Sequence, residues 1–505
     1  MKLAILTILI FSGSGLTSAE AQSWPQGSGA NGNYQSEGSE PPVRWSVSTG
    51  ENILWKQTLP EAGQSGIAIV GDKLFLTVKK PLPDGAPKET PSTADELGLC
   101  LDARTGKILW QILVPGTKSQ TYISMFISEP TPVADETRVW FITSNGGMVC
   151  TDHNGKELWK RVFDVDPLHN AQFSQPMIVD GKIIHVALKE PLTGTLNLSK
   201  NSGKGPWSCL HAYDAATGKP LWKSEAATAV FSAPGFAKMG AQTVLFHGRG
   251  GPHNPPETPH GFSLSSADTG KTIWNCDVKS GLSFFPAHLD EQHAFVFDTN
   301  KLLQLDLKTG QAGRSFDLAQ HADWYHRNPS SQKIELQQGA KFAGGAHPSY
   351  HSSILLGSHL LFMSHNHPSI GRVNVETGKV EYLHVPYQVV RKPQAADQTL
   401  WDKHIGSTPT NARGMDVSGD KRELHSGWGH VTVPAPIAVN GKVYFVTMIG
   451  TVYVVDANAK NFDGTALQWV GDLGPAAQTW TLASLSYANG HLYARTLKEV
   501  VCIGK

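Results

Sequence analysis

Residues 101–110 read LDARTGKILW, and variants of this string recur along the chain. In each copy an apolar stretch ends in Asp, Asn or a similar short polar residue. A Gly-containing turn follows, and a second stretch then opens with aliphatic residues and often Trp. Glycine supplies the positive φ that a tight hairpin turn needs, and the short polar side chains bond locally to the backbone. Each copy therefore predicts a β-hairpin. Later copies end at Trp159, Trp222 and Trp274 or begin at Leu305 and Asn374.

A second series of hairpin turns precedes these copies, for example at Asp180-Gly181 and Asn440-Gly441. Paired hairpins that repeat every 45 to 80 residues, roughly, give four strands per unit, which is the signature of a β-propeller. The predicted units are 66–115, 128–163, 174–225, 232–278, 283–319, 350–388 and 433–473.

The two chain termini are predicted to share one further blade. The last unit, 481–505, has three predicted strands before the chain ends. Its fourth strand is expected near the N-terminus, where residues 49–55 read TGENILW and repeat the turn and the Trp. Sharing a blade closes the ring and leaves no exposed sheet edge between the termini. We therefore expect an all-β fold, a single eight-bladed propeller over residues 43–505.

The N-terminal 42 residues are expected to lie outside this propeller. Residues 1–21 combine Lys2, an apolar run and a small-residue cleavage pattern, which together predict a signal peptide. The protein is then exported, either periplasmic or secreted, and no later apolar stretch is long enough for a transmembrane helix. Residues 22–42 are rich in Gly, Ser and Asn and predict a flexible lead-in.

Charge and cysteine content narrow the class of protein. The 43 Lys and Arg residues balance 43 Asp and Glu residues, which argues against nucleic-acid binding because phosphates attract a basic surface. The five cysteines include no adjacent pair and no CxxC motif, and they are expected to be mostly small buried side chains. They are Cys100, Cys150, Cys209, Cys276 and Cys502.

The repeats resemble the PQQ-like, or quinoprotein alcohol dehydrogenase-like, eight-bladed propellers of exported bacterial proteins. The resemblance rests on the turn-and-Trp strings and on Ser-x-Pro strings at 128–130, 174–176 and 232–234. It implies the propeller fold, whereas the family's functions range from alcohol and sugar dehydrogenases to a scaffold lipoprotein of outer-membrane assembly. The dehydrogenases hold pyrroloquinoline quinone (PQQ) between a vicinal disulfide and a Trp, beside calcium. This chain has no adjacent Cys pair, so no specific motif supports PQQ with calcium.

The insertions on one rim of blades four to seven are rich in His, Arg and aromatic residues. Loops on a rigid scaffold carry binding sites, and Arg, Trp and Tyr anchor anions, sugars and protein partners. The same side chains also satisfy buried backbone groups where long loops pack together. The candidate ligand-binding residues are His247, Arg249, His253, Trp324, Tyr325, His326, Arg327, His351, Arg413 and His430.

A transition-metal site is a narrower hypothesis. His365 and His367 stand two residues apart and so share one side of an extended strand, and His351 begins a neighbouring inner strand. Three convergent imidazoles could hold zinc, although a His-x-His string also arises by chance in a His-rich chain.

Three functions remain open from the sequence, and whether the chain is an enzyme is one of the open points. The first is an exported binding or scaffold propeller for a small anionic or saccharide-like (glycan) ligand or a protein partner. The second is a PQQ-dependent oxidoreductase. The third is a metal- or His-based carbohydrate lyase or hydrolase, with Tyr325, His326 and Arg327 as base, acid and carboxylate clamp.

Overall fold

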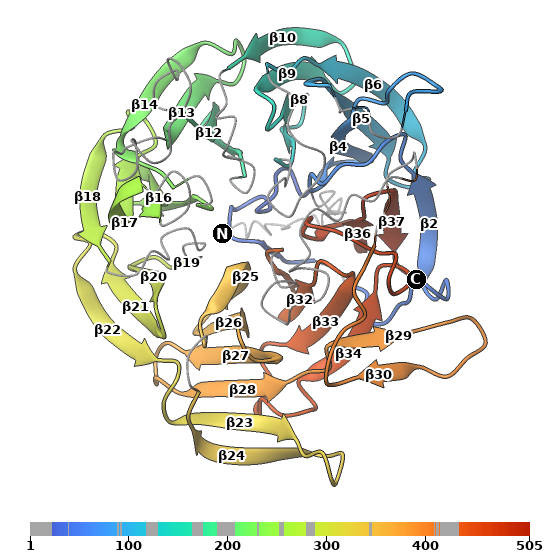
Figure 1. Cartoon of the computed structure of the whole chain (residues 1–505). Helices are drawn as coiled ribbons and strands as arrows, with labels where there is room; N and C mark the ends of the chain where they lie inside the picture. The colour runs from blue at the N-terminus through green and yellow to red at the C-terminus, as the bar shows by residue number, and fades with distance from the viewer. Residues whose placement is uncertain are drawn as a thin grey trace, which may run out of the picture.

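The computed structural model describes residues 23–38, 40–87, 90, 93–117, 130–163, 175–188, 208–229, 232–251, 257–278, 288–342, 346–408, 410, 414 and 434–505. Within these ranges, eight four-stranded units stand around a central axis, each with its first strand innermost (Figure 1). The predicted all-β, eight-bladed propeller is confirmed. No helix in the described part of the chain is both long and apolar enough to cross a membrane.

The blades follow the predicted units closely. Blade one contains β3 (Ala68–Val70), β4 (Lys73–Lys79), β5 (Glu96–Asp102) and β6 (Ile108–Val114), and blade two β7 (Val133–Ala134), β8 (Arg138–Ile142), β9 (Gly147–Asp152) and β10 (Glu157–Val162). Blade three contains β11 (Met177–Val179), β12 (Lys182–Leu188), β13 (Ser208–Asp214) and β14 (Pro220–Ala227), and blade four β15 (Gly235–Met239), β16 (Gln242–Gly251), β17 (Glu257–Ser266) and β18 (Thr272–Asp277). Blade five contains β19 (His288–Leu289), β20 (His293–Asp298), β21 (Lys301–Asp306) and β22 (Ala312–Asp317).

The remaining blades carry the departures from this plan. Blade six contains β25 (Pro348–Leu356), β26 (His359–Ser364), β27 (Ser369–Asn374) and β28 (Val380–His384), extended by β23 (Ala322–Arg327) and β24 (Ile334–Ala340). Blade seven contains β31 (Ile437–Val439), β32 (Lys442–Val446), β33 (Thr451–Asp456) and β34 (Leu467–Asp472), with β1 (Gln35–Ser36) added in parallel at its inner edge. The hairpin of β29 (Gln388–Val390) and β30 (Gln398–Leu400) projects from the ring beside blade seven (Figure 1).

Blade eight closes the ring with strands from both ends of the chain. It contains β35 (Ser486–Ala488), β36 (His491–Arg495), β37 (Glu499–Ile503) and the N-terminal β2 (Ile53–Thr58). Trp55 lies opposite Cys502 in the antiparallel pair β2–β37. The predicted shared blade, with residues 49–55 supplying its fourth strand, is therefore confirmed.

Residues 23–38 differ from the flexible lead-in that their composition suggested. Trp24 is 1% exposed, and its backbone exchanges hydrogen bonds with Ile69 of blade one at 2.9 and 2.8 Å. Tyr34 is buried on the far side of the segment, where its carbonyl accepts the Ala438 N–H of blade seven at 2.9 Å. The two aromatic anchors outweigh the Gly, Ser and Asn around them, because burying such rings contributes several kcal/mol, roughly. The segment thus packs across the propeller axis.

At five of the blade junctions, a tryptophan of one blade packs directly on a turn glycine of the next blade. The Trp110 ring of blade one covers Gly155 of blade two, where a Cβ would come 2.8 Å from the ring. Its indole N–H donates to the His153 carbonyl at 3.1 Å. The glycine–tryptophan contact recurs between Gly106 and Trp55, Gly218 and Trp159, Gly270 and Trp222, and Gly310 and Trp274. The core itself lies between facing sheets, as in the edge-on pair Phe75–Phe141 at 6.4 Å.

Arginine side chains make the contacts at the two junctions that flank blade six. Arg314 stands where the repeat places Trp, and it donates to the carbonyls of Val375 and Glu376 at 2.8 and 2.7 Å. On the other side, Arg372 donates to the Ala459 carbonyl of blade seven at 2.6 Å and pairs with Glu381 at 2.6 Å. Blade six is therefore clamped by guanidinium groups instead of indole rings.

The tryptophan–glycine contact can be tested with two alanine substitutions that share the same backbone strain. Gly155 and Gly181 both have positive φ, but a Cβ at Gly181 meets nothing within 4 Å. Gly181→Ala should lower the free energy of unfolding by about 1–2 kcal/mol, because alanine is strained at positive φ. Gly155→Ala should lower it by about 1–3 kcal/mol more, because its Cβ would also overlap the Trp110 ring. Urea unfolding of both variants measures the difference, and equal losses of stability would contradict the contact's importance.

Candidate functional site

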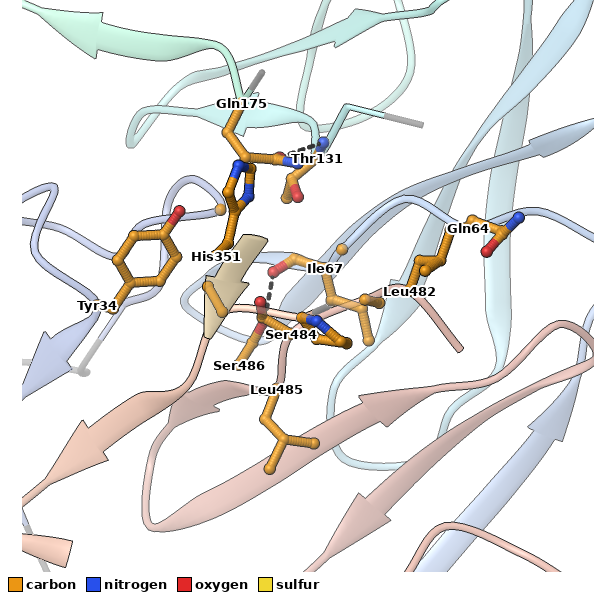
Figure 2. A pocket seen from close by; sticks show the side chains of 15 residues that line it. Tyr34, Gln64, Ile67, Thr131, Gln175, His351, Leu482, Ser484, Leu485 and Ser486 are labelled. Atoms are coloured by element: carbon orange, nitrogen blue, oxygen red, sulfur yellow. Dashed lines mark hydrogen bonds between the residues drawn. The ribbon is translucent and has the colours of Figure 1, made fainter. Parts of the chain in front are cut away.

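A small cavity lies on the propeller axis, at the inner ends of several blades (Figure 2). Its lining comes from the segments that lead into the first strands, including Gly66, Thr131, Gln175 and Ser484, and from Tyr34 of the N-terminal segment. His351 of β25 lies beside Gln175 and Tyr34 in this view. The cavity thus gathers polar side chains from several blades around the axis.

Hydrogen bonds draw these lining segments tightly together. Gln175 Oε1 accepts the Thr131 backbone N–H at 2.8 Å, and the Ser486 hydroxyl donates to the Ile67 carbonyl at 2.7 Å (Figure 2). A Cβ on Gly66 would overlap the Thr131 hydroxyl. The cavity measures about 30 Å³, which is room for about two water molecules.

The described residues that line this cavity do not fit a quinone cofactor with calcium. Ligands of cofactor size occupy sites of about 300–1,000 Å³, far more than this cavity provides. The sequence lacks the adjacent Cys pair of the dehydrogenases, and burial raises the pKa of Cys100, Cys150 and Cys502 to about 12. These thiols, like Cys209 and Cys276, are free in the structure, and Cys276 is the one that is partly exposed.

The three candidate metal ligands do not converge. His351 lies at the axial cavity, His365 stacks on His347 with ring centroids 5.4 Å apart, and the ring of His367 lies 4.7 Å from that of Phe342. Among the described residues, no three His, Cys, Asp or Glu side chains are arranged to hold a metal ion. Within the part of the chain that the structure describes, the predicted three-histidine cluster is therefore not formed.

His247 and Arg249 lie inside blade four, on β16. His247 is fully buried and bridges the hydroxyls of Thr228 and Ser265, 3.0 Å from each. Burial lowers its pKa to about 3, so the ring is neutral. Arg249 is 5% exposed and pairs with Asp277. His247 thus links Thr228, which follows β14 of blade three, to β17 of blade four, and Arg249 links β16 to the end of β18. None of these contacts involves blade six.

Blade six does assemble several of the candidates. We call Trp324, His326, Arg327, His384 and Trp401 the blade-six cluster; all five are partly exposed. The Trp324 ring lies 4.8 Å from His326 and 6.5 Å from His384, whose ring lies 5.2 Å from Trp401. The Arg327 guanidinium stands 4.7 Å above the Trp401 ring, and the Arg327 backbone N–H donates to His384 Nδ1 at 3.2 Å.

The blade-six cluster contains a positively charged group, the Arg327 guanidinium, and a neutral imidazole, that of His384. Burial, together with the neighbouring His326 and Arg327, lowers the pKa of His384 to about 4. His384 is therefore neutral at pH 7, and the Arg327 guanidinium, which is always protonated in proteins, carries the positive charge. Tyr325 belongs to the other face of β23, where it packs against the core and where burial raises its pKa. The cluster thus offers an aromatic surface with a single guanidinium.

Sequence reasoning missed His384 and the contacts that unite this cluster. His384 ends an ordinary apolar strand, and its importance follows from the parallel pairing of β23 with β28, which sets Trp324 opposite Tyr382. A hydrophobic pattern with no hairpin turn between the strands gives no signal for that pairing. His253, Arg413 and His430, like the predicted signal peptide at residues 1–21, lie outside the described residues.

The fold and the repeats define a PQQ-like propeller, and comparison with known proteins identifies the family. The family model described as "Outer membrane protein assembly factor BamB" matches residues 34–202 and 209–381, and the chain belongs to this family. No curated protein matches the chain in sequence.

Solved structures agree on the fold. The quinohemoprotein alcohol dehydrogenase ADHIIG of Pseudomonas putida HK5 has a TM-score of 0.52 at 12% identity, with 95% of this chain and 80% of that chain covered. The quinohemoprotein alcohol dehydrogenase of Comamonas testosteroni has a TM-score of 0.50 at 12% identity over the same shares. BamB of Moraxella catarrhalis has a TM-score of 0.48 at 12% identity, covering 89% of this chain and 99% of that chain. At such low identity the likeness to the two dehydrogenases shows the fold alone.

Buried histidines predict an acid-sensitive fold. Burial lowers the pKa of His185, His247 and His288 to about 3 each, against about 6.5 in an unfolded chain. Between these values the unfolded chain binds more protons, so stability is full above pH 6.5 and falls as the pH drops. Each ring contributes up to about 1.4 kcal/mol per pH unit.

His247→Asn should reduce this pH dependence by about one proton. Urea unfolding at several pH values between 4.5 and 7 measures the slope. His321→Asn, at an exposed position, is the control that should leave the slope unchanged. An unchanged slope in His247→Asn would show that this ring is not held neutral by burial.

Proposed function

We propose that this protein is an exported binding propeller whose blade-six cluster holds a protein partner. The observation that carries the proposal is a set of contacts where β23, a strand added to blade six, meets β28 and the residue after β30. It joins Trp324 and Arg327 of β23 to His384 of β28 and to Trp401. The family description as an assembly factor supports a partner in place of a substrate. The signal-like residues 1–21 support export, to the periplasm or out of the cell.

The chemistry of the cluster suits a protein interface. Trp and Arg are the residues that most often dominate binding energy at interfaces, particularly where a rim of weaker contacts excludes water. The Arg327 guanidinium stands over the Trp401 ring, so both side chains are held before a partner arrives and less entropy is lost on binding. Strand β24, mostly exposed, provides a polar border beside them.

The same geometry speaks against the two enzymatic alternatives. The axial cavity of about 30 Å³ and the separated cysteines do not suit PQQ chemistry. Tyr325 packs against the core, whereas the His326 ring lies against Trp324 in the blade-six cluster. A base and an acid that must meet one substrate are therefore not brought together by these two side chains.

Site-specific photo-crosslinking tests this proposal. A photoreactive amino acid replaces His326 in the full chain, expressed in its native host, and the crosslinked protein is identified by mass spectrometry. We expect one dominant adduct, which the same substitution at Leu158, exposed on blade two, does not give. Absence of any adduct specific to position 326 would refute the proposal.

The partner so identified is then purified and its affinity measured for three forms of the full chain. Trp401→Ala should weaken binding about 30-fold, the effect of losing a hot spot of about 2 kcal/mol. Leu158→Ala should bind like the unaltered chain, because it changes an exposed side chain away from the cluster. Equal affinity in Trp401→Ala would place the interface elsewhere.

A further inference from the structure

A second surface lies on the rim of tight turns, where the N-terminal segment crosses the axis. Three amide side chains there, Asn31, Asn33 and Gln35, form what we call the amide ridge. Two grooves lie beside the ridge, one of about 820 Å³ and one of about 560 Å³, and all three residues line each of them. The larger groove extends to the Asn440-Gly441 turn of blade seven, and the smaller one to the turns of blades four and five. The ridge therefore divides one hollow region into two halves.

The ridge is held in a fixed shape. Tyr34 has a φ of +62°, which a non-glycine residue adopts only when its surroundings impose it. Its backbone N–H donates to the Ser28 carbonyl at 2.7 Å, and its carbonyl accepts the Ala438 N–H at 2.9 Å. Gly32 packs on Phe236 of blade four so closely that a Cβ would overlap the ring. Strain in a rigid, exposed loop is typical of binding sites.

The groove of about 560 Å³ combines the chemistry that recognises a sugar. Phe236, partly exposed beside Gly32, offers apolar surface to the C–H groups of a sugar. The exposed Asn31 and Asn33 offer amide groups to its hydroxyls. Its volume lies within the range of sites for small ligands.

The charges of this groove favour a neutral ligand. Asp290 and Glu291 of the blade-five turn line it. Its lysine, Lys238, is paired with Asp180 at 3.1 Å. Two carboxylates beside a neutralised lysine repel an anion, so an acidic sugar is disfavoured. An extended peptide would gain its affinity from a free strand edge, but β1 is only two residues long.

We propose that the two grooves and the amide ridge bind a neutral oligosaccharide, which lies across the ridge. This site is on the rim opposite to the insertions, and it is independent of the partner surface on blade six. A trisaccharide would place one residue over Phe236 and extend over the ridge toward Asn440. Binding should be weak, near a Kd of about 1 mM, since few polar groups replace water.

Calorimetric titration of the full chain with three probes tests the site: cellotriose, maltotriose and the trimer of N-acetylglucosamine. At least one should bind saturably, and the double variant Asn31→Ala, Asn33→Ala should lose at least about tenfold in affinity. The exposed Asn154→Ala, on the blade-two turn, should bind like the unaltered chain. Phe236→Leu, which keeps an apolar residue at the contact with Gly32, should also weaken binding.

Two results would overturn the proposal. One is the absence of binding by all three trisaccharides up to about 10 mM, well above the expected Kd. The other is sugar binding that the double variant leaves unchanged. Binding of a neutral heptapeptide where no sugar binds is a case of the first result, and it would assign the grooves to a peptide. Neither result bears on the blade-six partner, because crosslinking from position 326 samples a different surface.

Discussion

The tryptophan that lies on the next blade's glycine is the contact on which the ring depends. A blade alone would expose the face that it packs against its neighbour, and each blade must also be placed accurately for the ring to close. The Trp110 indole contributes to both. Its ring packs on Gly155 of the next blade, and its N–H donates to the His153 carbonyl and so fixes the position of the two blades. Any side chain larger than hydrogen at the glycine would push the two blades apart.

Blade six departs from this scheme, and the departure explains where the proposed partner surface lies. Tyr382 stands where the repeat places Trp, and its hydroxyl turns inward to the Leu318 carbonyl at 2.7 Å. The outer edge of β28 pairs with β23, which brings Trp324 into contact with His384. Guanidinium clamps from Arg314 and Arg372 hold the blade in place of the missing ring contacts.

The features that repeat in every blade could be predicted from the sequence, whereas features that occur once in the chain could not. Each hairpin turn has a local signal, such as Asp180-Gly181, where both residues take positive φ as primed turns demand. That is why the blade boundaries and the shared blade could be derived from the sequence. Trp24 and Tyr34 gave no such signal within a Gly-rich segment. The histidines were grouped by composition, and the structure divides them among the interior of blade four, the axis and the edge of blade six.

The most direct test of the account is amide hydrogen exchange of the full chain, free and bound to its crosslinked partner. Exchange reports which backbone segments become protected on binding. The account predicts new protection in β23, β24 and residues 384–401, with the strands around the axial cavity unchanged. Protection centred on the axis, on β25 and the N-terminal segment, would contradict it and would place the function in the central channel.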